Sequence, residues 1–221
     1  MTYYILGMLS ILITVLAQIY IKVTYNKYNT IKNKKDLTGF EVAKKILEKN
    51  DLDKVYIVET KGYLTDHYDP KSKVVRLSKN VFNGTSISAI AVAAHECGHA
   101  IQHKNGNKFM QIRSFLVPFV NFSTKLGYIV ILIGLIAGLL QMFYFGIILI
   151  LVILLFQLVT LPVEFGASRD ALNYLEKYDL VTKEEKDDAK EVLTSAALTY
   201  VASLATTVIE VVRLLSLVDR D

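Results

Sequence analysis

Cysteine and proline are scarce in this chain of 221 residues, and charge is nearly balanced. The single cysteine, Cys97, excludes an intrachain disulfide framework. With only three prolines, long helices can run through most of the chain. The net charge is only +4 without a dense basic stripe, so a nucleic-acid partner is not expected. Hydrophobic residues are abundant, at 52% of the total, which favours a membrane protein.

The first uncharged stretch covers residues 1–21. As a helix it is long enough to cross a hydrocarbon core of roughly 30 Å. A cleaved signal peptide is the alternative, but it would begin with a basic segment, and no Lys or Arg precedes Lys22. We therefore expect a retained N-terminal membrane anchor over residues 1–21.

The longest uncharged stretch runs from Leu126 to Val163, which is more than one span needs. It predicts a transmembrane hairpin with helices over about 126–141 and 146–162, joined by a turn at 141–146. Gly134 and Gly138 form a small-xxx-small pair that would permit close helix contact, or they are simply tolerated glycines.

A last apolar stretch, 192–217, is interrupted by Glu210 and Arg213. It either spans, lies at the interface or packs on the other helices, which gives three to four transmembrane helices. Five lysines follow the first span, and the positive-inside rule then places residues 22–113 in the cytoplasm. The hairpin returns Glu164 and Arg169 to that same side. These lysines are Lys22, Lys27, Lys32, Lys34 and Lys35.

The soluble part should combine helices with a β-hairpin. The patterns predict a short amphipathic helix over 39–49, a β-rich run over 55–58, and a hairpin of 63–68 with 74–77 around an Asp-Pro turn. A helix over about 87–104 follows, and 175–191 reads as a solvated connector. The expected organisation is an anchor (1–21), a cytosolic part (22–113), a transmembrane hairpin (114–165) and C-terminal helices (166–221) that together form one integrated domain.

The helix over 87–104 carries an H-E-x-x-H motif, His95-Glu96-Cys97-Gly98-His99. Four residues advance a helix by about 400° and 6 Å, so both imidazoles point the same way and can share one zinc ion. Glu96 points elsewhere and can accept a proton from a zinc-activated water. Cys97 should face away from the metal and pack, and Gly98 should permit close approach of another backbone or of substrate.

A catalytic zinc needs a third protein ligand. His103 lies about 12 Å further along the same helix, too far to share the metal, and fits better as a helix-end histidine. Glu164 is the first charge after the long uncharged stretch, at the expected membrane boundary, where carboxylates are usually functional. The alternative is a glutamate that only ends the span.

Several segments together resemble the YugP family, bacterial membrane proteins classed as neutral zinc metallopeptidases, over residues 3–217. The resemblance implies a gluzincin-type peptidase, distantly similar to HtpX-like and CAAX prenyl proteases. It implies His95, His99 and Glu164 as zinc ligands and Glu96 as general base. The matching segments are 64–70 (LTDHYDP), 74–78 (VVRLS), 91–96 (AVAAHE) and 161–165 (LPVEF).

One position departs from the family pattern, which has Asp where this chain has Gly166. Asp170 is the substitute candidate for orienting a ligating histidine. Arg169 pairs with Glu164 or Asp170, or extends to the membrane boundary. His67 on the hairpin and Tyr200 are further candidates for substrate or oxyanion contacts. Ordinary strand exposure for His67 and packing for Tyr200 are the alternatives.

The sequence therefore predicts a mainly α integral membrane protein with a zincin-like helical catalytic core and a small β-hairpin. We expect a zinc metalloendopeptidase with one Zn²⁺ per chain, in the cell membrane of a bacterium, with its active site on the cytoplasmic side. Its partners would be the lipid bilayer and a membrane-associated or unfolded polypeptide substrate. The alternatives are a catalytically silent scaffold or regulator with a structural or degenerate zinc site and, less favoured, a transporter.

Overall fold

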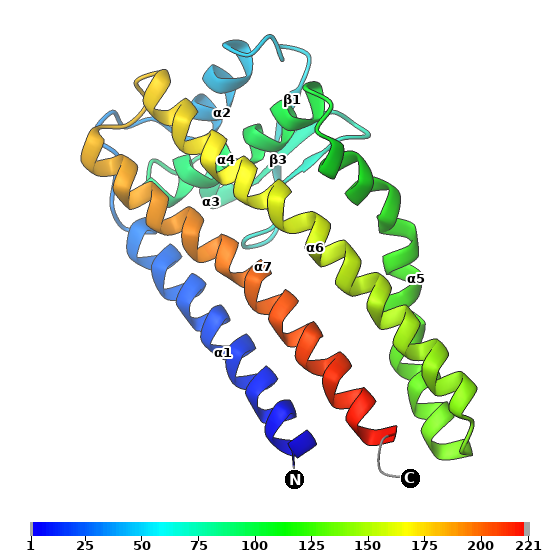
Figure 1. The fold of residues 1–221 in the computed structure, drawn as a ribbon. Helices are drawn as coiled ribbons and strands as arrows, with labels where there is room; N and C mark the ends of the chain where they lie inside the picture. The colour runs from blue at the N-terminus through cyan, green and yellow to red at the C-terminus, as the bar shows by residue number, and fades with distance from the viewer. Residues whose placement is uncertain (1, 219–221) are drawn as a thin grey trace. The chain divides into compact units, whose positions relative to one another are not determined.

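Helices make up most of the computed structural model, which describes residues 2–218 and bears out the predicted mainly helical class (Figure 1). Four of the helices are long and apolar enough to cross a membrane: α1, α5, α6 and α7. In chain order the elements are α1 (Thr2–Asn29), α2 (Gly39–Glu48), β1 (Tyr56–Thr60), β2 (His67–Asp69), β3 (Val74–Ser78), α3 (Lys79–Phe82), α4 (Ile87–Lys104), α5 (Lys108–Ala137), α6 (Leu140–Lys177) and α7 (Lys183–Val218).

The described residues form two compact units; α1, α6 and α7 contribute to both, and α5 belongs to the first. The first unit consists of residues 2–18, 108–162 and 198–218. The second consists of residues 19–107 and 163–197. The domain boundaries expected from the sequence stay predictions.

In the first unit, the turn of the expected hairpin lies at Gly138 and Leu139, so the predicted turn at 141–146 is wrong. Gly138 has a φ of +65°, and the Leu139 amide donates to the Gly134 carbonyl at 2.8 Å. This is a Schellman end, in which a glycine in the left-handed region closes the helix. The residues at 141–146 therefore lie in the first turns of α6, which begins at Leu140.

The glycines of this hairpin have different roles. A Cβ on Gly134 would lie 2.6 Å from the backbone nitrogen of Phe143, so this glycine permits close helix contact. Gly138 has nothing within 4 Å of that position, so the expected Gly134–Gly138 contact pair is only half right. Gly146 is the second close-contact glycine instead, because a Cβ at this position would clash with Ile131.

The α7 helix differs from the sequence prediction at its start. It begins at Lys183, so most of the expected solvated connector 175–191 is helical, and Leu175, Leu180 and Ala189 within that range are buried. The two charges in its apolar part pair with each other. Arg213 donates to Glu210 at 2.6 and 2.8 Å, one turn away, which lowers the cost of placing both charges in an apolar segment.

In the second unit, three short strands form a mixed sheet of order β1-β3-β2. β2 and β3 form the predicted antiparallel hairpin, and β1 pairs with β3 in parallel. Strand β2 begins only at His67, so the predicted strand start at Tyr63 is wrong. Gly62 and Leu64 have positive φ, and Asp66 accepts hydrogen bonds from Ser78, which makes 61–66 a loop.

Helices α2, α3 and α4 gather around this sheet (Figure 1). Thr38 and Glu41 cap the start of α2 reciprocally, and the Ser86 hydroxyl accepts from the Ala89 amide at the start of α4. Helix α4 is buried over most of its length, so it forms the centre of the unit. Cys97 is fully buried and its thiol donates to the Ala43 carbonyl, as expected for a packing residue.

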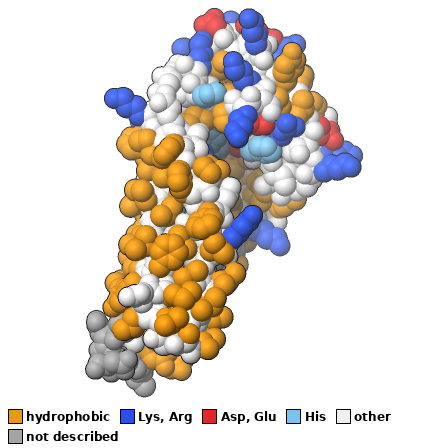
Figure 2. All heavy atoms as spheres, turned by 90° about the vertical axis from the view of Figure 1, so that its right-hand side faces the viewer, with side chains coloured by type: hydrophobic (Ala, Val, Ile, Leu, Met, Phe, Trp, Pro, Cys, Tyr) orange, Lys and Arg blue, Asp and Glu red, His pale blue; other side chains and the backbone are white. Residues whose placement is uncertain are grey.

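The surfaces of the two units differ in composition. Most of the large exposed hydrophobic side chains belong to α1, α5, α6 and α7. On the face drawn in Figure 2, hydrophobic side chains crowd the long helices, and histidines gather with most of the charged groups elsewhere. A hydrophobic surface of this extent fits the lipid contact that the four candidate spans indicate.

Candidate metal centre

Helix α4 brings the two motif histidines together. The rings of His95 and His99 lie edge to face with their centres 4.7 Å apart, as the four-residue spacing predicts. Helix α6 supplies the third potential ligand, Glu164. One oxygen of Glu164 lies 3.3 Å from Nε2 of His95 and 3.5 Å from Nε2 of His99. The three side chains, predicted as a set from the sequence, thus meet in space.

The close approach of the two helices depends on Gly98. A Cβ at this position would lie 2.8 Å from the backbone carbonyl oxygen of Ala167 on α6. Since backbone cannot give way as a flexible side chain can, any larger residue would separate α4 from this part of α6. The prediction that Gly98 permits close approach of another backbone is confirmed.

The geometry of the three groups fits a small tetrahedral ion. Potential ligand atoms of His95, His99 and Glu164 all lie within 4.8 Å of one another, and the group is largely buried. Zinc bonds of about 2.0–2.1 Å at tetrahedral angles place neighbouring ligand atoms roughly 3.3 Å apart. The observed 3.3 and 3.5 Å agree with that spacing. Two imidazoles and one carboxylate are also a ligand set that zinc accepts, with a fourth position left for water or substrate.

Each histidine has a polar partner at its other ring nitrogen. The Ser168 hydroxyl lies 3.2 Å from Nδ1 of His95, and the Gln102 carbonyl oxygen lies 3.3 Å from Nδ1 of His99. Such partners orient the rings of metal-binding histidines. Sequence reasoning missed both residues. The available signal was spacing, since Gln102 follows His99 by one turn and Ser168 follows Glu164 by one turn.

Glu96 lies in the same buried region but outside the group of three. It is only 7% exposed, and burial raises the pKa of its carboxyl to about 7. A positive charge on His95 and a hydrogen bond from the Tyr68 amide act in the opposite direction. Negative charge on Glu164 and Asp66 raises the pKa further. A carboxyl that titrates near neutral pH is suited to accept and return a proton.

Three other residues predicted from the sequence, Arg169, Asp170 and His67, are not part of the group of three ligand candidates. The Arg169 side chain is 75% exposed and contacts the neighbouring Asp170 at 3.5 Å, so the expected Arg169–Asp170 pair is present. Within residues 2–218, the Nδ1 partners of the two histidines are Ser168 and Gln102, and neither is Asp170. His67 is exposed, and its Nδ1 contacts the Thr65 carbonyl.

The two remaining candidates, His103 and Tyr200, lie on helices α4 and α7. His103 is in the last turn of α4, where its Nδ1 contacts the Tyr68 hydroxyl at 2.9 Å, and it is not part of the group of three. Tyr200 is on α7 in the first unit, and its role stays a prediction.

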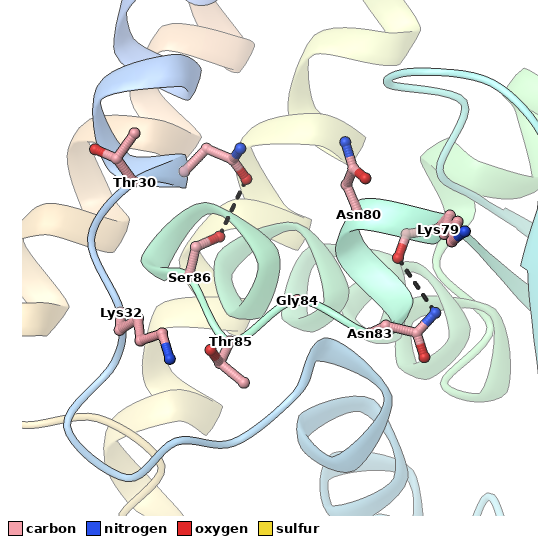
Figure 3. A pocket seen from close by; sticks show the side chains of 9 residues that line it. Thr30, Lys32, Lys79, Asn80, Asn83, Gly84, Thr85 and Ser86 are labelled. Atoms are coloured by element: carbon pink, nitrogen blue, oxygen red, sulfur yellow. Dashed lines mark hydrogen bonds between the residues drawn. The ribbon is translucent and has the colours of Figure 1, made fainter.

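Two surface pockets of the second unit are built from other residues. One of about 470 Å³ has walls from the end of α1, from α3 and from the start of α4 (Figure 3). There Asn83 contacts the Lys79 carbonyl, and Ser86 contacts Asn29. The other, of about 520 Å³, includes Tyr68 and His103. Neither lining includes His95, His99 or Glu164.

Comparison with known proteins gives a consistent result. The curated protein "Putative membrane protease YugP" of Bacillus subtilis (strain 168) is 41% identical over 197 residues, which is 89% of this chain and 88% of that protein. No solved structure matches the chain significantly. Residues 3–219 match the family described as "Putative neutral zinc metallopeptidase", and the chain belongs to this family.

Proposed function

We propose that this protein is a membrane-embedded zinc metalloendopeptidase of the gluzincin type. The observation that carries the proposal is the meeting of Glu164 with His95 and His99 at zinc-like ligand spacings, on an H-E-x-x-H helix. The family supports zinc as the metal. The α4 helix with the β2–β3 hairpin beside it supports a zincin-like core.

The ligands have defined tasks in this proposal. His95, His99 and Glu164 would hold one Zn²⁺, which when bound would polarise the scissile carbonyl and lower the pKa of a water molecule. Glu96 accepts the proton from the attacking water and delivers it to the departing amine nitrogen. Burial raises the pKa of the Glu96 carboxyl above its usual range, which makes it a better proton acceptor than an exposed glutamate.

The four candidate spans and the relative described as a membrane protease support a bacterial cell membrane as the location. The lysines in the last turns of α1 and directly after it support a cytoplasmic active site. Substrates would then be membrane-associated or unfolded polypeptides. A cysteine introduced at exposed Lys71 tests the orientation, because a membrane-impermeant maleimide should label it only after the cells are opened. Labelling in intact cells would place the site outside.

The catalytic proposal is tested with the full-length protein in detergent or nanodiscs. Wild type should bind one zinc and cleave casein, and a chelator should abolish the cleavage. Glu96→Gln should keep the zinc and lower the cleavage rate by roughly 10²–10⁴-fold, the usual contribution of general acid–base catalysis. Exposed Glu59→Gln on β1 serves as a matched control and should cleave at the wild-type rate.

The second candidate is a catalytically silent scaffold or regulator that holds a structural zinc. Uncharged partners, Ser168 and Gln102, contact both imidazoles, and they raise ligand basicity less than a carboxylate would. Stoichiometric zinc with no chelator-sensitive cleavage of casein by wild type would favour this candidate over the peptidase.

A further inference from the structure

We propose that Gln102 is the positioning residue of His99 and that Gly166, by having no Cβ, leaves the room that the Gln102 amide occupies. The inference rests on the proposed zinc site and adds to it a specific pair of residues. Gln102 follows the motif on α4, and Gly166 lies on α6 two residues after Glu164.

The orientation of the Gln102 amide is determined by its two partners. Its NH₂ group donates to the Val163 carbonyl at 2.9 Å, and a carbonyl can only accept. The amide oxygen therefore faces Nδ1 of His99, at 3.3 Å. An oxygen in this position favours the tautomer with the proton on Nδ1. The lone pair of His99 is then on Nε2, the atom that lies 3.5 Å from Glu164.

Gly166 borders the same amide. A Cβ at this position would lie 2.8 Å from Nε2 of Gln102, inside van der Waals contact. A free side-chain end could swing away at little cost. The Gln102 side chain is buried at 5% exposure and is held by hydrogen bonds at both ends of its amide. A displacement that relieves the clash must lengthen at least one of those two bonds.

The expected size of the effect follows from comparable partners of metal-binding histidines, whose loss weakens metal binding by roughly 10–100-fold. Because Gln102 is uncharged, we expect the lower end, about tenfold, for Gln102→Ala. Gly166→Ala should have a similar effect, although alanine is the better helix former and should strengthen α6 itself. A loss of zinc affinity in that variant therefore cannot come from a weakened helix.

A double-mutant cycle on zinc affinity tests the pair. Zinc dissociation constants are measured by chelator competition on the full-length protein for wild type, Gln102→Ala, Gly166→Ala and the double variant. Once the Gln102 amide is gone, the methyl group at position 166 meets nothing to displace. The double variant should thus bind zinc as Gln102→Ala does, about tenfold more weakly than wild type, instead of showing the roughly 100-fold loss of two independent effects.

Ser88→Ala is the matched control, since it removes a buried hydrogen bond from α4, to the Tyr25 carbonyl, away from the histidines. It should lower the unfolding temperature of the metal-free protein and leave zinc affinity unchanged. Additive losses in the cycle, or an unaffected Gly166→Ala, would overturn the inference while leaving the zinc site standing. A wild type that binds no zinc would overturn both. A Ser88→Ala variant as weak as Gln102→Ala would also count against a specific role for Gln102.

Discussion

The two units of this protein accommodate charged side chains in different ways. In the first unit, Glu210 and Arg213 are one turn apart on the same helix and neutralise each other. In the second, Glu164 on α6 contacts two histidines on α4, and helix α5 lies between these two helices in the chain. A charge satisfied by its own helix needs no other segment. A carboxylate turned toward two imidazoles of another helix, with its ligand atoms within 4.8 Å of theirs, indicates a metal site.

Replacing Glu164 or Glu210 by glutamine should give the largest difference in zinc affinity between the two units. Glu164→Gln removes the charged ligand and should weaken zinc binding by more than about 100-fold, beyond the effect of losing a partner of a ligand. Glu210→Gln should leave zinc affinity at the wild-type value and lower stability by about 1 kcal/mol. Chelator competition and thermal unfolding measure the two effects. Equal zinc affinities in the two variants would contradict Glu164 as a ligand.

Alanine at the close-contact glycines should give the next largest contrast. Gly98→Ala and Gly134→Ala both place a methyl group against backbone, at 2.8 Å from the Ala167 oxygen and 2.6 Å from the Phe143 nitrogen. Each should destabilise the protein by about 1–3 kcal/mol, as overpacking usually does. Only Gly98→Ala should also weaken zinc binding, because it moves α6 away from the histidines. If Gly134→Ala weakened it as much, the loss would reflect general destabilisation.

The smallest contrast concerns two hydroxyls. Ser168→Ala removes the partner of His95 Nδ1, and we expect zinc affinity to fall by up to about tenfold. Ser216→Ala in the first unit removes a hydroxyl that donates to the Arg213 carbonyl of its own helix. It should not change zinc affinity. Isothermal titration of zinc into the metal-free proteins compares them, and an unchanged Ser168→Ala would mean that His95 needs no such partner.

A feature could be predicted from the sequence where its geometry is determined within one helix, and not where it depends on the packing of two helices. The four-residue spacing of His95 and His99 is enough to predict that both rings lie together, because helix periodicity alone places them on one face. Glu164 could be identified because it is the first charged residue after a long apolar stretch, and carboxylates at a membrane boundary are usually functional. Ser168 and Gln102 carry no charge, and their contacts depend on how two helices rotate against each other, which no single-helix pattern contains.

The errors in the fold have the same origin. The turn at 138–139 was placed too late because polar and aromatic residues at 141–146 resemble a turn but are also tolerated at a helix start. The spacing of Gly134 and Gly138 suggests either helix contact or tolerated glycines, whereas Gly138 in the structure ends a helix, which glycine equally signals. The connector 175–191 was assigned to solvent because its charges obscure the spacing of Leu175, Leu180 and Ala189, which pack only in the folded unit.

The Gln102 amide also helps to fix how α4 and α6 are aligned, because it adds a second contact between them to that of Glu164. Helix α6 meets α4 through the Glu164 side chain and, one residue earlier, through the Val163 main chain. Sliding α6 by a single residue along its helical path would move each atom by about 1.5 Å and turn it by about 100°. Both connections would break together, so a misaligned helix pair could neither hold the carboxylate in place nor keep the imidazole in the tautomer that faces it.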